Sequence, residues 1–233
     1  MSKMLTTLTQ GLTQLGLSLP EKTAQKLCQF GEGVILQNEV MNLTAITDPE
    51  QVARLHLLDS LSLLAVADLR NKRIIDVGCG AGFPGVPVKI ACPEARLTLL
   101  DSLGKRMNWL AGFLPQLGVE AECVTARAEE AVVDRRESYD YATSRAVARL
   151  NILLELTAPY VKVGGAVLAM KGTAALEELA EAENAIKKLG LRVEEVRQFP
   201  VEDTAHTVIV LRKVKPTPAQ YPRRFAKIKQ APL

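Results

Sequence analysis

The sequence predicts an α/β protein with a doubly wound sheet of seven strands, the last two antiparallel, and a helical N-terminal extension. Three observations lead to this fold class. From residue 73 onward, short apolar runs alternate with helical segments, which is typical of βαβ units in a parallel sheet. The last two apolar runs are separated only by a short loop, which favours a hairpin. No strand pattern interrupts roughly the first 70 residues.

The N-terminal extension is predicted to contain three helices. The third has the clearest start signal, because Thr47 or Asp48 can cap it and Pro49 suits its first turn. Its apolar residues recur at helical spacing and form a stripe that should be buried. The three predicted helices are residues 3–16, 21–37 and about 48–67.

The remainder of the chain is predicted to alternate between strands and helices before it reaches a basic tail. The strands are Arg73–Val77, Arg96–Asp101, Glu120–Ala126, Tyr139–Ser144, Gly165–Met170, Leu191–Phe199 and His206–Val214. The helices between them lie near 85–91, 104–116, 128–133, 149–160 and 174–189. The predicted organisation is therefore a helical cap (1–70), a core (71–214) and a basic C-terminal tail (215–233).

Composition excludes several classes of protein. The 233 residues are 48% hydrophobic and 24% charged, close to the globular average, which argues against disorder, collagen and coiled coil. No apolar run approaches the roughly 20 residues that span a bilayer, and the N-terminus lacks the apolar block of a signal peptide. A cytoplasmic protein is expected. The sequence does not indicate an oligomeric state, and we favour a monomer.

A zinc site is not expected. The four cysteines are far apart and form no Cys-x-x-Cys pair, and only two histidines accompany them. Reduced and mostly buried thiols are the simpler interpretation. The cysteines are Cys28, Cys79, Cys92 and Cys123.

Charge is distributed unevenly along the chain. Seven of the 29 basic residues lie in 212–233, which holds no acidic residue; the other 22 basic and 26 acidic residues give a body of net charge −4. A basic tail on an acidic body suits a polyanionic partner, although a solvated strand and tail would look the same. Aromatic residues make up only 4% of the chain, which does not support an aromatic stacking platform for single-stranded nucleic acid.

The most informative stretch is the loop after the first predicted strand. Gly78, Gly80 and Gly82 alternate there, and a helix follows. Glycine permits positive φ and close approach of a ligand to the backbone, while the helix N-terminus offers free N–H groups. A dinucleotide fingerprint needs glycine where this chain has Phe83, and a P-loop needs a Gly-Lys-Ser/Thr sequence that is missing.

Two acidic residues narrow the choice of ligand. Asp76 precedes the loop, and Asp101 closes the second strand, 23 residues after Gly78. A carboxylate at the end of the second strand can accept both hydroxyls of a ribose. An adenosine ligand without a pyrophosphate fits this arrangement, and S-adenosylmethionine is such a ligand.

Several further motifs make the chain recognisable from about residue 38 to the C-terminus. They are Asn42-Leu43-Thr44, His56-x-x-Asp59-Ser60-Leu61, Asp76-Val77-Gly78-x-Gly80-x-Gly82-Phe83-Pro84-Gly85, Asp101-Ser102-x-x-Lys105-Arg106, Arg127-Ala128-Glu129, Ser144-Arg145-Ala146, Lys171-Gly172 and Tyr221-Pro222-Arg223. With them the sequence resembles the class I S-adenosylmethionine-dependent methyltransferases. More closely, it resembles the bacterial glucose-inhibited division protein B family, the small-subunit (16S) ribosomal RNA guanine-N7 methyltransferases.

The resemblance implies a Rossmann-like methyltransferase sheet, S-adenosyl-L-methionine as the cofactor, ribosomal RNA or a ribosomal particle as the partner, and no metal. It also implies which residues hold the cofactor: Gly78, Gly80 and Phe83 in the loop, Asp101 and Ser102 at the ribose, Ala128 and Glu129 at the adenine, and Arg145 in the cleft. No catalytic residue is assigned, and Arg145 is the candidate for positioning. Cys79 is given no role.

Five basic residues are candidates for contacts with RNA phosphates. Lys105 and Arg106 begin a helix just past Asp101, where a solvated helix face is the alternative. Lys171 follows the fifth strand, on the ligand-binding edge. Arg223 and Arg224 belong to the basic tail.

Other functions remain as alternatives. His56, Asp59 and Ser60 share one helix face, which suggests a hydrolase, but no Gly-x-Ser-x-Gly elbow exists and a docking role is favoured. Cys92 has no neighbouring base to activate it as a nucleophile. The fourth strand lacks the Asn/Asp-Pro-Pro-aromatic ending of exocyclic-amine methylases. A small-molecule methyltransferase and a non-catalytic S-adenosylmethionine- or RNA-binding module stay open.

Overall fold

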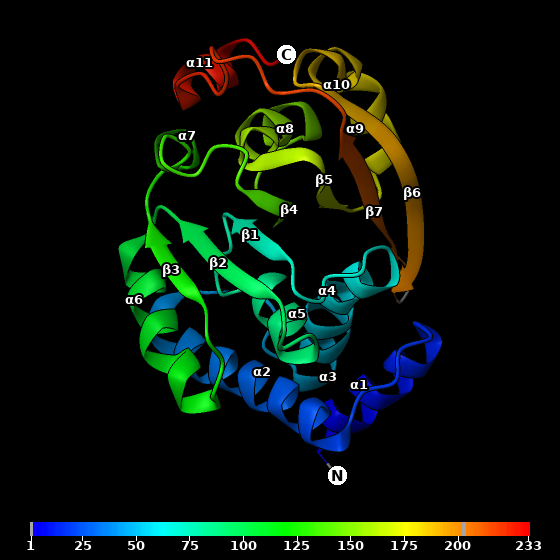
Figure 1. Cartoon of the computed structure of the whole chain (residues 1–233). Helices are drawn as coiled ribbons and strands as arrows, with labels where there is room; N and C mark the ends of the chain where they lie inside the picture. The colour runs from blue at the N-terminus through cyan, green and yellow to red at the C-terminus, as the bar shows by residue number, and fades with distance from the viewer. Residues whose placement is uncertain (1, 202–203) are drawn as a thin grey trace.

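The computed structural model describes residues 2–201 and 204–233, and its centre is a seven-stranded sheet in the order β3-β2-β1-β4-β5-β7-β6 (Figure 1). The strands are β1 (Arg73–Val77), β2 (Arg96–Asp101), β3 (Glu122–Thr125), β4 (Tyr139–Arg145), β5 (Val161–Lys171), β6 (Leu191–Val201) and β7 (Thr204–Lys213). The first five strands are parallel, while β7 pairs antiparallel with both β5 and β6. The predicted doubly wound sheet with a terminal hairpin is confirmed.

Helices cover both faces of the sheet. They are α1 (Lys3–Gln14), α2 (Glu21–Met41), α3 (Pro49–Val52), α4 (Asp59–Leu61), α5 (Gly85–Ala91), α6 (Gly104–Phe113), α7 (Ala128–Ala131), α8 (Leu150–Thr157), α9 (Ala175–Glu181), α10 (Glu183–Lys188) and α11 (Phe225–Gln230). Short 3-10 turns follow α4, α6 and α8. The N-terminal helices lie with α5 and α6 on one side of the sheet, and α8, α10 and α11 lie on the other (Figure 1).

The N-terminal helices pack directly on the sheet. A single cluster of buried side chains runs from Met4, Leu8 and Phe30 to Ile74 and Leu99 in the first two strands. Burial of apolar side chains in one continuous cluster stabilises the helices and the sheet together. The division into cap, core and tail stays a prediction.

The third predicted helix is interrupted, which the sequence did not indicate. After α3, a π-helical segment, η1 (Ala53–Leu58), precedes the single turn of α4. A π turn inserts a residue into the helical register, so side chains beyond it point differently from those of a continuous α-helix. The segment contains His56, and Asp59 follows it directly; both side chains lie at the ligand-binding edge of the sheet.

Two further predictions about the elements were wrong. The predicted helix 174–189 is two helices that meet at Ala182, and β5 begins four residues earlier than expected. The residues after β7, the predicted basic tail, pack against the rest of the protein. They contain α11, and the Arg136 guanidinium donates hydrogen bonds to the backbone carbonyls of Thr217, Pro218 and Tyr221.

No helix in the described part of the chain is long and apolar enough to cross a membrane.

Candidate active-site cleft

A cleft of about 870 Å³ opens where β1, β4 and β5 end. Ligands of open α/β sheets bind at this edge. The predicted site residues that line the cleft are Gly78, Gly80, Phe83, Arg106, Arg145 and Lys171. Residues that were not predicted as site residues also line it, among them Thr44, His56, Asp59, Val147, Glu178 and His206.

The glycine loop has the backbone that its sequence predicts. Gly78, Gly80 and Gly82 have φ values of 72°, 56° and 96°, a region that residues with a Cβ rarely occupy. A Cβ placed on Gly80 would approach only the Arg106 Nη1 atom, at 3.9 Å. The space above Gly80 is therefore open to a ligand that approaches the backbone closely.

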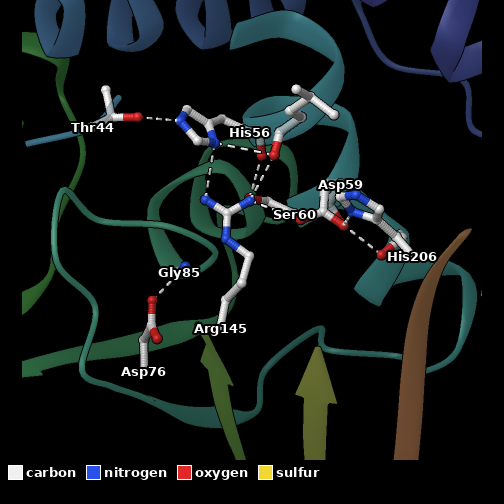
Figure 2. Close-up of polar contacts among 10 residues, drawn as sticks. Thr44, His56, Asp59, Ser60, Asp76, Gly85, Arg145 and His206 are labelled. Carbon is white, nitrogen blue, oxygen red and sulfur yellow. Dashed lines mark hydrogen bonds and ion pairs between the residues drawn. The ribbon is translucent and has the colours of Figure 1, made fainter. Parts of the chain in front are cut away.

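Asp76 lies beneath this loop and is fully buried. Its Oδ2 accepts a hydrogen bond of 2.7 Å from the Gly85 N–H, which ties the end of β1 to the start of α5 (Figure 2). Its Oδ1 has no hydrogen-bond partner among the described residues. Burial is the main cause that raises the pKa of Asp76 to about 7, so a nearby cationic group would favour its ionised form.

Asp101 does not line the cleft itself, but it is hydrogen-bonded to Gly80, which does. One carboxylate oxygen accepts from the Gly80 N–H and the other from the Leu103 N–H, both at 2.9 Å. Each oxygen of an ionised carboxylate can accept a second hydrogen bond, so these contacts leave room for a ligand hydroxyl. Ser102 is exposed beside it, and Ala128 with Glu129 begin α7 after the neighbouring strand.

Arg145, at the end of β4, is the centre of a polar network that reaches across the cleft (Figure 2). Its Nη1 donates to Asp59 Oδ2 at 2.7 Å and to the Leu55 carbonyl at 2.9 Å. The guanidinium also lies 5.2 Å from the centroid of the Phe83 ring. Arg145 therefore joins the sheet, the glycine loop and the π-helical segment through one side chain.

His56 is held between Arg145 and Thr44. Its Nδ1 lies 3.2 Å from the Arg145 guanidinium and 3.1 Å from the Leu55 carbonyl, and its Nε2 lies 2.8 Å from Thr44 Oγ1. Burial, followed by the charge of Arg145, lowers the pKa of His56 to about 4, so the ring is neutral at pH 7. Ser60 donates to the His56 carbonyl at 2.5 Å and not to the ring. This geometry contains no serine–histidine nucleophile pair.

Asp59 bridges Arg145 to His206, which comes from β7. The His206 Nδ1 lies 2.7 Å from Asp59 Oδ1. Burial alone would raise the pKa of Asp59, but the hydrogen bond from His206 and the charge of Arg145 together hold it below the ordinary value. The hydrogen bond with Asp59 raises the pKa of His206, against the opposing effect of its own burial.

His206→Gln is expected to lower the free energy of unfolding in a pH-dependent way. A histidine whose pKa is raised by folding contributes its full stability below its ordinary pKa of about 6.5, provided that Asp59 is ionised, and loses it as the pH rises through the raised value. The difference from the wild type should be largest near pH 5.5 and should shrink by pH 8.5 in urea unfolding. A constant difference across this range would contradict the pairing.

The structure separates the five predicted phosphate contacts into two groups. Lys171 pairs with Glu178 at 2.8 Å, and Arg223 binds the fully buried Glu155 through Nε and Nη2 at 2.8 and 2.6 Å. These two charges are already neutralised within the protein. The second group comprises Lys105, Arg106 and Arg224. Their side chains have no hydrogen-bond or ion-pair partner among the described residues.

The comparisons with known proteins agree with this architecture. The family model of rRNA small subunit methyltransferase G (GidB) matches residues 23–207. A ribosomal RNA small subunit methyltransferase G from Alkaliphilus metalliredigens is 44% identical, over 96% of this chain and 95% of that protein. One from Acetivibrio thermocellus is 41% identical, over 97% of this chain and 95% of that protein.

Solved structures share the fold at low sequence identity. A SAM-dependent methyltransferase from Aquifex aeolicus has a TM-score of 0.53 at 19% identity, covering 70% of this chain and 93% of that one. M. jannaschii TYW2 in complex with AdoMet has a TM-score of 0.52 at 12% identity, covering 64% and 72%. The family match over most of the length, with near full-length relatives above 40% identity, shows that the chain belongs to the rRNA small subunit methyltransferase G family.

Proposed function

We propose that this methyltransferase transfers a methyl group from S-adenosyl-L-methionine to N7 of a guanine in small-subunit ribosomal RNA. One observation carries the proposal. The glycine loop lines a cleft at the ends of β1, β4 and β5, where the Phe83 ring of the loop contacts the Arg145 guanidinium. The cofactor and the class of substrate follow from the family. The guanine N7 atom rests on the resemblance seen in the sequence. A substrate in the ribosome implies work in the cytoplasm.

The residues present fit the cofactor. The open space above Gly80 would admit it against the backbone, and Asp101 with Ser102 would accept the ribose hydroxyls. Ala128 and Glu129 would lie at the adenine. When bound, the cofactor supplies an electrophilic methyl group on a positively charged sulfur.

For methyl transfer to guanine N7, the main task of the protein is to position the guanine against the methyl group. Guanine N7 has an available lone pair and carries no proton, so attack on the methyl group needs no general base. The histidine of the cleft agrees with a reaction that needs no base: the low pKa of His56 makes it a weak base, and its two nitrogens face Thr44 and Arg145. Positioning and the desolvated field of the cleft would then account for the rate.

The cleft also restricts where RNA phosphates can be bound. Of the basic side chains lining it, Arg145 and Lys171 are engaged by Asp59 and Glu178, whereas Arg106 has no hydrogen-bond or ion-pair partner in the described residues. We therefore assign the phosphate contacts to Arg106 and Lys105 beside the cleft and to Arg224 in the tail. Arg223 is assigned to anchoring the tail.

The test is transfer of a radiolabelled methyl group to small-subunit RNA, with mapping of modified guanines in cells with and without the protein. The expected result is one guanine whose N7 methylation disappears with the protein. Label that enters only small metabolites would favour a small-molecule methyltransferase. Binding of the cofactor without any transfer would favour a non-catalytic module.

Charge reversal in the tail is expected to weaken RNA binding and to flatten its salt dependence. The double variant Arg224→Glu/Lys227→Glu changes two exposed residues and leaves the anchor Arg223 in place. Each lost phosphate contact should reduce the slope of log Kd against log salt by roughly 0.7 on single strands and 0.9 on duplex.

The matched control is Lys22→Glu/Lys26→Glu on α2, which lies on the opposite side of the sheet from α11 and makes the same change in net charge (Figure 1). Cofactor affinity should stay unchanged in both variants. Equal salt slopes in the two variants would assign the tail a structural role only.

A further inference from the structure

We propose that Lys171, through Glu178, positions the loop between β4 and α8 (residues 146–149) for methyl transfer, and that it does not bind RNA. This inference rests on the proposed function. It deepens that function by assigning a positioning role to a residue on the wall of the same cleft. Lys171 ends β5 and Glu178 lies in α9, so neither residue belongs to the loop that they hold.

The contacts of this pair all converge on one end of the loop. The Lys171 Nζ donates a hydrogen bond to the Ala148 carbonyl and forms a 2.8 Å ion pair with Glu178 Oε2. The same carboxylate oxygen accepts from the Leu150 N–H at 2.8 Å. Lys171 therefore acts on the loop directly and also by fixing the carboxylate that caps the first turn of α8.

Burial makes this pair a rigid support. The side chains of Lys171 and Glu178 are only 7% and 14% exposed. The other link between the loop and α9, from Arg149 to Glu177 and Glu181, involves side chains 44% to 67% exposed, and exposed ion pairs contribute little. The loop is therefore held mainly by the Lys171–Glu178 pair at this end, and at the other end it continues directly from Arg145 in β4.

The loop that they hold forms a wall of the cleft against the glycine loop. Ala146 has a φ of 56°, which turns the chain sharply after Arg145. A Cβ on Gly78 would lie 2.4 Å from Val147 Cγ2, so Val147 covers that glycine. Ala146, Val147 and Ala148 all line the cleft. The place of this loop thus sets the space in which the methyl donor and the target base meet.

A small displacement of this wall should be costly for the reaction. Methyl transfer needs the attacking atom and the methyl group in line, and a misplacement of about 1 Å can reduce a rate about 100-fold. Loss of the pair should therefore act on kcat more than on substrate binding. A phosphate ligand would show the opposite pattern.

The experiment compares Lys171→Met, which keeps the bulk of the side chain, with Glu178→Ala. In both variants kcat at saturating cofactor should fall about 10- to 100-fold, while KM for RNA stays within about threefold and the salt slope of RNA binding is unchanged. The matched control is Lys162→Met, on the same strand, which removes an ion pair with Asp140 that lies outside the cleft. It should leave kcat unchanged.

Two results would overturn the inference. If Lys171 binds phosphate, Lys171→Met should flatten the salt slope by roughly 0.7 to 0.9 and raise KM without lowering kcat. In that case Glu178→Ala should tighten RNA binding, because it frees the lysine from its counter-charge. A fall in kcat in Lys162→Met equal to that in Lys171→Met would also contradict it, since any lost lysine would then have the same effect.

A second readout separates this inference from the proposed function. The Leu150 amide hydrogen, which Glu178 accepts, should exchange with solvent at least about tenfold faster in Lys171→Met and Glu178→Ala, measured without RNA. Unchanged exchange would overturn the positioning role whatever the substrate. Faster exchange in a protein whose wild type methylates no RNA would instead overturn the proposed function. If Lys171→Met does not fold, Glu178→Ala carries the same comparison.

Discussion

Gly80→Val is expected to weaken binding of S-adenosyl-L-methionine at least about 100-fold, which is roughly 2.8 kcal/mol at 1.4 kcal/mol per factor of ten. Apart from the two neighbouring residues, the nearest atom to a Cβ at this position is Arg106 Nη1 at 3.9 Å, the end of a flexible side chain that can move away from a valine. It would instead occupy the space through which the cofactor reaches the backbone. Calorimetric titration measures the loss.

The control for this prediction is Gly16→Val. Gly16 also has positive φ, 68°, and a Cβ there would meet nothing within 4 Å. Both variants should lose about 1–2 kcal/mol of unfolding free energy from the left-handed conformation. Only Gly80→Val should lose the cofactor. Unaltered cofactor affinity in Gly80→Val would mean that the ligand does not lie against this loop.

Arg145→Met should lower the free energy of unfolding by about 3–5 kcal/mol, as expected when one partner of a buried ion pair is removed. The Asp59 side chain is only 4% exposed and that of Arg145 16%, so the carboxylate would stay buried with only its hydrogen bond to His206. Urea unfolding at pH 7 measures the effect. Methyl transfer should fall as well, because Arg145 joins β4 to the glycine loop and to the helical segment.

Two further variants test the reason for this loss. Arg70→Met removes an exposed pair with Asp68 and should leave the free energy of unfolding nearly unchanged. The double variant Arg145→Met/Asp59→Leu should recover more than half of the stability, because it removes the buried carboxylate that would otherwise lack Arg145, while His206, which also loses its partner, can become neutral. If Arg145→Met costs no more than Arg70→Met, the network does not hold the helical segment to the sheet.

Much of the fold could be predicted from the sequence because its signals are local. An apolar run between turn residues predicts a strand wherever it occurs, and each of the seven predicted strands overlaps an observed one, with the largest difference at the start of β5. The π-helical segment at Ala53–Leu58 was missed because its apolar pattern resembles that of an α-helix. The break at Ala182 was missed for the same reason, since no proline or glycine marks it.

The glycine loop was the easiest part of the site to predict, because its function depends on residues that are adjacent in sequence and on their backbone conformation. Arg145 was found because strand ends at this edge build sites. His206 was missed as a site residue: it lies 147 positions from Asp59, and a lone histidine in a strand carries no signal of its own. Thr44 was seen only as part of a motif, without its contact to His56.

The sequence by itself determined the βαβ order, the glycine loop and the positions of the basic residues, since each is a property of a short stretch of chain. Only the tertiary structure decided which of those basic residues have an acidic partner within the protein. Lys171 and Arg223 were predicted as phosphate contacts, and folding pairs them with Glu178 and with Glu155, the second from 68 positions away. A charge acts on whatever lies within a few ångströms of it, and those neighbours are set by the packing of distant segments.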